Sequence, residues 1–380
     1  MRRAIIVAAG LAGVSGCGGA VGVDATAPAA TTAAIINGDV CDASVEPTAV
    51  AVMIDASVDF GQGEPLAITQ ASCTGTLIAP DVVMLAAHCL DLDSLTFGFG
   101  TVEFADFYVT FEADLSRFGG EQSLPIPESA VPAKKGVVNP AFDINALGEG
   151  TGGLESDIAL LFLEVAITDV TPEVVITTDE ASQLAEGSSV RIAGWGQQVA
   201  TSSPFEQPPA GSVGIKVCGT STIEELGTSL MQVGDATETT RKCHGDSGGP
   251  TYIEVTTPST IKRRVIGVTS RAYDQSDCAR GGVDTRVDAF FAWVDDEMRG
   301  GCSDGTRVWC DVPGVLTADD VAILDGGGVP GEGEGEGEGE GDAIDPIAPG
   351  GCNCSGSGGA DMGLMGALAA LFAGRRRRQR

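Results

Sequence analysis

The chain has 380 residues, a formal net charge of −31 and 11 cysteines. This length is enough for one large domain or two modest ones, each with a sizeable core. So acidic a chain is a poor candidate for binding nucleic acid, because phosphates need Lys and Arg. The charge favours solubility outside a cell, and 54 glycines with few aromatic residues favour turns and short strands over long helices.

The N-terminal sequence MRRAIIVAAGLAGVSGC combines a basic start with a short apolar run. This pattern predicts a secretory signal peptide over 1–17, because the run is too short for a spanning helix. Its last four residues, VSGC, resemble a bacterial lipobox, in which Cys17 would carry a lipid anchor; ordinary cleavage is the alternative. Residues 18–34 are rich in Ala, Thr, Gly and Pro, and we expect a flexible tether or propeptide there.

Two strand-like runs precede the first of the two histidines. TGTLIAP alternates and is rich in strand formers, and VVMLAA is an apolar run that leads directly to His88. We expect both to be strands that deliver His88 to the edge of a sheet. Further strand-like runs such as FADFYVTFEA lie between 97 and 146, where the sequence shows no recognisable chemistry.

A serine surrounded by glycines lies in the segment RKCHGDSGGP. The hydroxyl of Ser247 is a poor nucleophile unless a base accepts its proton. His244 is three residues away in a tight turn and is not expected to reach that hydroxyl, so His88 is the candidate base. A base needs an orienting carboxylate, and Asp157 directly precedes the apolar run IALLFL, which predicts a buried strand. A glycine-rich turn without chemistry is the alternative for this serine segment.

The segments LAAHC, DIALL and GDSGGP occur in the order His, Asp, Ser and together resemble the trypsin-like serine proteases of the chymotrypsin fold. GWG at 194–196 and GVDTRV at 282–287 fall where that family has comparable segments. The resemblance covers about 35–298 and implies an all-β domain of two antiparallel β-barrels with a C-terminal helix. The segment 288–298 has apolar residues at helical spacing and predicts this helix.

The resemblance also implies the roles of the site residues. His88 is the general base and acid, Asp157 holds its tautomer, and Ser247 attacks the scissile carbonyl. The backbone N–H groups of Gly245 and Ser247 form the oxyanion hole, which requires a sharp bend in the loop. The expected protein is a serine-type endopeptidase that needs no metal or other cofactor. A catalytically silent binding or adhesion protein on the same fold is the alternative, since a fold does not guarantee a function.

The segment IINGDVC resembles the mature N-terminus of that family. By this resemblance, an activating protease frees an ammonium group at Ile35, which pairs with Asp246 and orders the oxyanion loop. Ala34 precedes the cleavage position, where the family commonly has Arg or Lys, so an activator of trypsin-like specificity is not expected. A first strand without any processing is the alternative.

An export signal makes disulfides the first interpretation of the cysteines. Cys302 and Cys310 lie beyond the expected domain and are predicted to close a small loop of their own. The resemblance implies three further pairs: Cys73 with Cys89, Cys243 with Cys278, and Cys41 with Cys218.

The resemblance places Arg241, followed by Lys242, at the base of the primary specificity pocket. Cleavage after Arg or Lys is not expected, because the trypsin subgroup has Asp at this position. If Arg241 is matched to the correct position of the family pattern, two interpretations stay open: a preference for acidic substrate side chains, or neutralisation of Arg241 by Asp284. The third is that the match is shifted along the sequence. Ser270 and Ala272 are expected to offer backbone groups to an extended substrate.

Residues 299–350 predict a linker, which includes the repeat GEGEGEGEGEG. This repeat cannot bury apolar surface and repels itself. The final segment, 351–380, contains a cysteine motif, the apolar stretch Met362–Ala373 and the basic end RRRRQR. The apolar stretch is well short of the roughly 20 residues that a spanning helix needs.

The order of these C-terminal features resembles the MYXO-CTERM sorting tail of myxobacterial surface proteins, with its cysteine motif at Cys352 and Cys354. The resemblance implies that the tail is removed and the protein stays at the cell surface; a retained weak membrane anchor is the alternative. The expected location is therefore the cell surface, the outer membrane or the medium. The expected partners are a protein or peptide substrate, an activating protease, and a lipid anchor or sorting enzyme.

Overall fold

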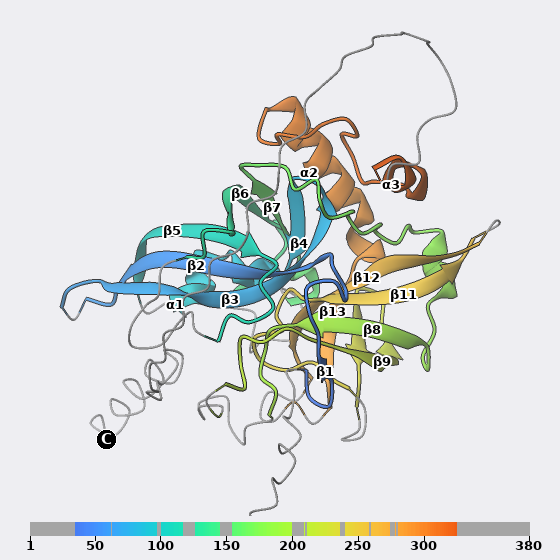
Figure 1. The fold of residues 1–380 in the computed structure, drawn as a ribbon, viewed down its shortest axis with the longest axis horizontal. Coiled ribbons are helices and arrows are strands. Elements are labelled where there is room, and N and C mark those ends of the chain that lie inside the picture. Colours follow the sequence, from blue (N-terminus) through green and yellow to red (C-terminus); the bar gives the residue numbers. More distant parts are fainter. Residues whose placement is uncertain are drawn as a thin grey trace, which may run out of the picture. The chain divides into compact units, whose positions relative to one another are not determined.

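A computed structural model describes most of the residues between 35 and 324 (Figure 1). The described ranges are 35–61, 63–96, 100–116, 126–144, 154–199, 209, 211–235, 240–257, 260–273, 278 and 280–324. The predicted signal peptide, tether, Gly-Glu repeat and sorting segment lie outside them. Among the helices in these ranges, none combines the length and the apolar character needed to cross a membrane.

Six antiparallel strands of the first half form a closed barrel (Figure 1). In order around the barrel they are β2 (Ala49–Asp59), β3 (Leu66–Ala79), β4 (Val82–Leu85), β7 (Ala159–Leu163), β6 (Val131–Val138) and β5 (Thr101–Thr110). β4 and β7 are buried along their whole length, as expected for short continuous apolar runs. They pair with each other, so the strand that leads to His88 lies beside the strand that follows Asp157.

The second half forms another closed ring of six strands, because β8 pairs with both β11 and β9. In order they are β8 (Ser189–Gly194), β9 (Val217–Leu226), β10 (Leu230–Val233), β13 (Gly282–Arg286), β12 (Ile261–Ala272) and β11 (Pro250–Thr256). The short β1 (Asp39–Val40) adds to β9. The prediction of two antiparallel β-barrels is therefore confirmed.

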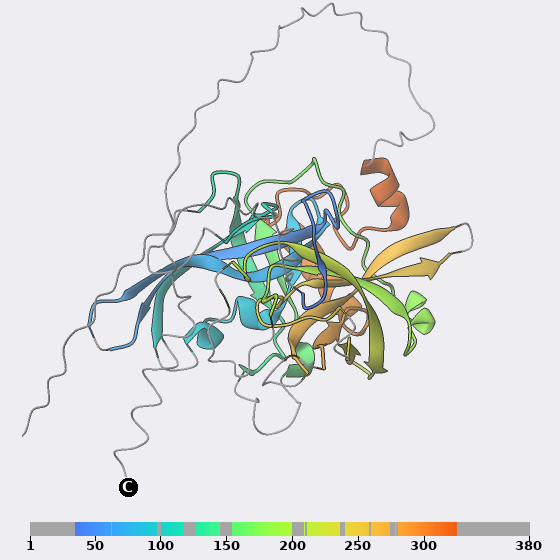
Figure 2. The same cartoon turned by 60° about the horizontal axis from the view of Figure 1, so that its bottom comes forward.

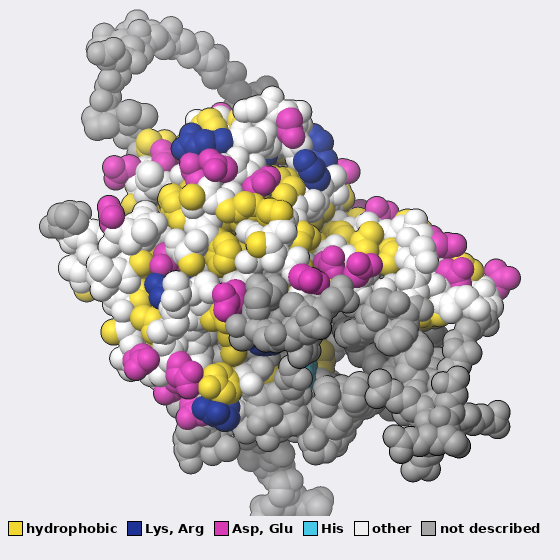
Figure 3. Space-filling view, turned by 180° about the vertical axis from the view of Figure 1, so that it is seen from behind, with side chains coloured by type: hydrophobic (Ala, Val, Ile, Leu, Met, Phe, Trp, Pro, Cys, Tyr) yellow, Lys and Arg dark blue, Asp and Glu magenta, His cyan; other side chains and the backbone are white. Residues whose placement is uncertain are grey.

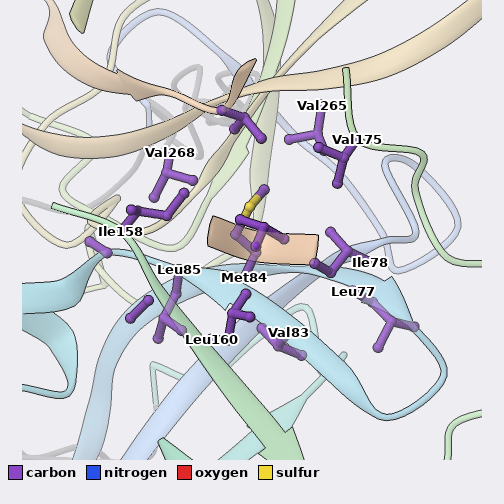
Figure 4. Close-up of a cluster of buried hydrophobic side chains, with 14 of the residues drawn as sticks. Leu77, Ile78, Val83, Met84, Leu85, Ile158, Leu160, Val175, Val265 and Val268 are labelled. Carbon is purple, nitrogen blue, oxygen red and sulfur yellow. The ribbon is translucent and has the colours of Figure 1, made fainter. Parts of the chain in front are cut away.

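The two barrels share one hydrophobic core (Figure 4). Leu77, Met84 and Leu160 of the first barrel belong to the same buried cluster as Val265 and Val268 of the second. The long hairpins β2–β3 and β11–β12 extend from opposite sides of the paired barrels in both ribbon views (Figures 1 and 2). Acidic side chains are spread over the face seen in Figure 3, where basic side chains stand singly or in small groups.

Short helical segments connect the strands. These are the 3-10 turns Ala87–Cys89, Leu154–Ser156, Glu180–Gln183 and Asp288–Phe290, and the helices α1 (Leu92–Thr96), α2 (Phe291–Ser303) and α3 (Ala318–Leu324). The terminal helix predicted at 288–298 is α2, which begins after one 3-10 turn and continues to Ser303. It buries Val294 and Met298 in the shared core.

The segment after α2 is fixed to the first barrel by a buried ion pair. Arg307 donates from Nε and Nη2 to Asp81 Oδ1, at 3.1 and 2.8 Å. The other carboxylate oxygen accepts the backbone N–H groups of Val308 and Trp309, at 2.8 and 2.9 Å. Both charged side chains are 0% exposed. The first part of the predicted linker therefore has defined contacts with the barrel.

Replacing one member of this pair tests its contribution to stability. We expect Arg307→Met to lower the free energy of unfolding by about 3–5 kcal/mol, because Asp81 stays buried without its counter-charge. Urea unfolding followed by circular dichroism measures the change. Arg299→Met is the matched control, since Arg299 is 57% exposed in its pair with Asp295 and should leave the midpoint almost unchanged. Equal shifts in the two variants would contradict this interpretation.

Candidate active site

His88 and Asp157 are brought together by the pairing of β4 with β7. His88 lies in the 3-10 turn directly after β4, Asp157 lies just before β7, and Leu85 is opposite Ala159 in the ladder. His88 Nδ1 is 2.8 Å from Asp157 Oδ2, and the backbone N–H of His88 donates to Asp157 Oδ1 at 2.9 Å. The two bonds fix both the position and the orientation of the imidazole relative to the carboxylate.

The second barrel also holds this carboxylate. Ser270 Oγ, on β12, donates to Asp157 Oδ2 at 2.7 Å, and Thr285 Oγ1, on β13, donates to the Asp157 carbonyl oxygen at 3.0 Å. Asp157 is 1% exposed, so its charge is satisfied by protein groups from both barrels. The sequence predicts for Ser270 only a backbone contact with the substrate, and no local pattern signals its side-chain contact with Asp157.

The pKa values of the pair move apart. Burial by itself lowers the pKa of His88, but the charge and hydrogen bond of Asp157 raise it more, so the net pKa lies above its usual value. Burial raises the pKa of Asp157, but His88 and the hydroxyl of Ser270 lower it further, so the carboxylate stays ionised. Each group therefore stabilises the charged form of the other.

Ser247 lies in a tight turn just before β11. Gly245 has φ 92° and Gly248 has φ 80°, both in the left-handed region that favours glycine. The backbone N–H of Thr74 donates to the Ser247 carbonyl oxygen at 2.8 Å, and the N–H of Gly248 donates to the carbonyl oxygen of Thr269 at 2.7 Å. The serine turn is thus bonded to β3 of the first barrel and to β12 of the second.

The same turn lies against the chain that leads to His88. A Cβ atom at Gly248 would be 2.2 Å from the Thr74 carbonyl oxygen and 3.0 Å from the Ala86 nitrogen, so only glycine permits this approach. A disulfide between Cys73 and Cys89 ties the turn that contains His88 to β3. His88, Asp157 and the serine turn therefore meet at the junction of the barrels, with His88 and Ser247 both partly exposed.

Asp246 is fully buried beneath the serine turn. Its carboxylate accepts the backbone N–H groups of Gly196 and Cys243, both at 2.9 Å. A Cβ atom at Gly194 would be 2.2 Å from the Asp246 carboxylate, and one at Gly196 would be 2.6 Å from its backbone nitrogen. The GWG segment thus provides the room that this carboxylate needs. Burial, only partly offset by these hydrogen bonds and by the charge of Lys242, raises the pKa of Asp246 to about 6.

The segment that starts at Ile35 lies beside the chain that enters the serine turn. Ile35 is 0% exposed, and its carbonyl oxygen accepts the N–H of Gly38 at 2.8 Å. Ile36 forms an isolated antiparallel bridge with Arg241. The backbone conformation at Ile35 is left-handed, with φ 50°.

Neighbouring cations behind the serine turn have different partners. Arg241 is buried and donates from Nε to the Cys278 carbonyl oxygen at 2.9 Å. Lys242 Nζ, rather than Arg241, pairs with Asp284 Oδ2 at 2.7 Å. The neutralisation of Arg241 by Asp284 that the sequence left open is therefore replaced by a Lys242–Asp284 pair. Ala272, the other expected pocket residue, is 8% exposed on β12 opposite Gly282.

Four disulfides are present among the described residues. They join Cys41 to Cys218, Cys73 to Cys89, Cys243 to Cys278 and Cys302 to Cys310. Two of them also account for the groups whose geometry suits a metal: Cys73, His88 and Cys89, and Cys243, His244 and Cys278. Because the cysteines of each group are bonded to each other, neither group offers a set of thiolate ligands.

Known proteins resemble this chain over most of the two-barrel region. The Trypsin family model matches residues 35–294. Chymotrypsin-like elastase family member 1 of Macaca fascicularis is 30% identical over 232 residues, which cover 59% of this chain and 77% of that protein. The protein of the same name from Homo sapiens is 28% identical over 232 residues, covering 59% and 80%. Kallikrein 1-related peptidase b3 of Mus musculus is 25% identical over 291 residues, covering 73% and 94%.

The two imidazoles provide a direct test of the electrostatics. We expect His88 to titrate above pH 6.5, because Asp157 stabilises its charged form, and His244 below 6.5, because burial disfavours its charged form. NMR titration of the imidazole protons measures both values. Asp157→Asn should lower the pKa of His88 and leave that of His244 unchanged. A His88 value below 6.5 in the unmodified chain would contradict the ion pair.

Proposed function

Because the chain belongs to the trypsin family, we propose that it is a serine endopeptidase that hydrolyses peptide bonds through an acyl-enzyme. His88, Asp157 and Ser247 form its catalytic triad. The observation that carries this proposal is the meeting of the His88–Asp157 pair with the serine turn, which is bonded to both barrels. Its substrates are proteins or peptides, which can reach the partly exposed side chains of His88 and Ser247 at the junction of the barrels.

The contacts of His88 support the following order of proton transfers. Nδ1–H of His88 donates to Asp157, which leaves Nε2 free to accept the proton of the Ser247 hydroxyl. The serine oxygen then attacks the peptide carbonyl carbon, and the imidazolium beside Asp157 gives its proton to the leaving amine. A water molecule then hydrolyses the acyl-enzyme. His88 accepts a proton from the water, the water oxygen attacks the acyl carbon, and the serine oxygen leaves and takes that proton back from His88. Asp157 stays ionised throughout, in keeping with its lowered pKa.

The oxyanion of the tetrahedral intermediate is stabilised by the backbone N–H groups of Gly245 and Ser247. The left-handed conformation at Gly245 allows the turn to direct both groups to one point. A Cβ atom at this position would be 2.9 Å from the Gly196 Cα atom, so a larger residue would displace the turn. Loss of one such donor costs about 2.7–4 kcal/mol in comparable enzymes.

Cleavage before Ile35 is the proposed activation step. It frees an ammonium group that pairs with Asp246, a buried carboxylate whose pKa is raised to about 6 in the uncut chain. The proposal is supported by the burial of Ile35 and by the bridge between Ile36 and Arg241, which place this segment beside the serine turn. An ion pair there stabilises the conformation in which the oxyanion hole is formed.

Export and attachment to the cell surface complete the proposal. The signal peptide at 1–17 directs secretion, and Cys17 is the candidate lipid site. Cleavage before Ile35 separates any such lipid from the catalytic domain. The C-terminal segment 351–380, read by a sorting enzyme, then keeps the enzyme at the surface.

A serine-directed probe tests the proposed activity. We expect a fluorophosphonate to label the chain that begins at Ile35, and Ser247→Ala to abolish labelling and lower kcat by about 10⁴-fold or more, because the nucleophile is removed. Mass spectrometry of the labelled peptide and peptide hydrolysis measure the two effects. Ser44→Ala is the control, since Ser44 is exposed and, among the residues that the structure describes, bonds with nearby Asp42 alone. Failure of the cleaved chain to react would favour a silent binding protein.

The pH dependence of stability tests the proposed activation. In the uncut folded chain, the pKa of Asp246 is about 6, which is above its value in the unfolded chain. The contribution of Asp246 to stability is therefore present below about pH 4 and is lost as the pH rises through 6. The new ammonium group lowers this pKa, so the stability gained by cleavage should grow between about pH 4 and 7. It should shrink above about pH 8, as the α-amino group loses its proton.

Melting temperatures of cleaved and uncut chains in a Ser247→Ala background measure this gain. A recognition site for a specific protease placed before Ile35 produces the cleaved form. The matched variant Asp246→Asn should show a gain that does not vary between pH 4 and 7. A pH-independent gain with Asp246 intact would refute the ion pair.

A further inference from the structure

A buried ion pair lies directly behind the serine turn, and the proposed reaction does not use it. Lys242 Nζ is 2.7 Å from Asp284 Oδ2, and the side chains are 1% and 0% exposed. Lys242 is five residues before Ser247, whereas Asp284 lies in the middle of β13. The pair therefore joins the entry to the serine turn to a strand from a distant part of the sequence.

Lys242 also reaches the chain that leaves the turn. Its Nζ donates to Thr251 Oγ1 at 2.7 Å and, more weakly, to the Gly249 carbonyl oxygen at 3.4 Å. The hydroxyl of Thr251 in turn donates to Asp284 Oδ2 at 2.6 Å. The two ends of the segment 242–251, which contains Ser247, are thus closed against each other by one ammonium group and one carboxylate.

The other contacts of the turn fix single points of it: Ser247 is bonded to Thr74, Gly248 to Thr269, and Cys243 forms a disulfide. Two of its glycines, Gly245 and Gly248, have left-handed backbone conformations, and a glycine-rich segment loses more conformational freedom on ordering than other sequences. Asp246 lies in the middle of the turn, and its carboxylate accepts the backbone N–H groups of Gly196 and Cys243 on the buried side. These contacts anchor single residues, whereas Lys242, Asp284 and Thr251 join the two ends of the turn to each other.

Stability alone is a weak reason for such a pair. Two buried charges with good geometry are often no more stabilising than apolar side chains of similar volume, although removal of one partner is costly. The stem of Lys242 is tightly packed, since a Cβ atom at Gly282 would be 3.1 Å from its Cβ. Apolar residues can fill this space, but they cannot provide hydrogen bonds between the two ends of the turn.

We propose that Lys242, with Asp284 and Thr251, is a positioning group that holds the two ends of the serine turn together and so fixes the oxyanion donors relative to the Ser247 hydroxyl. This inference rests on the proposed peptidase function. It also means that the charge of Lys242 is neutralised within the protein and is not offered to an acidic substrate side chain. The ion pair acts through the turn and touches neither the substrate nor the reacting atoms.

The double variant Lys242→Met/Asp284→Leu separates positioning from stability. We expect a melting temperature close to that of the unmodified chain, because neither charge is left unpaired. The rate of fluorophosphonate labelling and the value of kcat should each fall about tenfold or more. This is a smaller loss than the about 10²–10³-fold decrease in kcat that follows the complete removal of one oxyanion donor. KM for a short peptide should change little. Hydrogen exchange of the amides in 243–249 should become faster.

Two further variants complete the experiment. Thr251→Val preserves the shape of the side chain and the ion pair but removes the linking hydroxyl. It should give a smaller change in the same direction, and it tests the proposal even if the double variant does not fold. Arg307→Met leaves Asp81 buried without its counter-charge, in an ion pair that does not involve the turn. It should lower the melting temperature without changing the labelling rate or the exchange of 243–249.

Unchanged exchange and labelling in both the double variant and Thr251→Val would overturn the positioning role. So would equal slowing of labelling by the Arg307→Met control, because the effect would then reflect general loss of stability. If the unmodified, cleaved chain does not react with the probe, the proposed function fails. The exchange comparison still decides whether the pair holds the turn.

Discussion

The burial of Asp157 is the constraint on which the arrangement of the site depends. A buried carboxylate must be satisfied by hydrogen bonds or opposite charge, and here the partners come from both barrels. His88 contributes two contacts from the first barrel, and Ser270 and Thr285 contribute side-chain hydroxyls from the second. Any movement of one barrel relative to the other would break some of these bonds. The geometry of the His88–Asp157 pair is therefore coupled to the packing of the whole domain.

Buried charges recur wherever an irregular segment must be fixed. Asp246 is held beneath the serine turn by two backbone N–H groups, and Lys242 closes the ends of that turn with Asp284. Asp81 likewise holds the loop after α2 through Arg307. Turns and loops lack the regular hydrogen bonds of a sheet, so directional polar contacts fix their position, while glycines provide the space that these contacts require.

Local patterns were sufficient for the elements around the site. VVMLAA and IALLFL are continuous apolar runs, and both form buried strands that carry the histidine and the aspartate at their ends. The terminal helix was predicted to end at 298 but extends to Ser303, because Gly301 is also buried and the chain continues to the disulfide at Cys302. That extension lies outside the resemblance on which the domain end was based, so nothing in the compared motifs indicated it.

The sequence by itself determined the strand-forming runs, the order of His, Asp and Ser, and the glycines that allow a sharp turn. The tertiary structure alone decided which side chains meet: Ser270 with Asp157, and Lys242 rather than Arg241 with Asp284. The reason is geometric. Successive side chains in an extended segment point to opposite sides, so adjacent residues of the same charge face different neighbours. Those neighbours come from remote segments whose positions depend on the packing of both barrels.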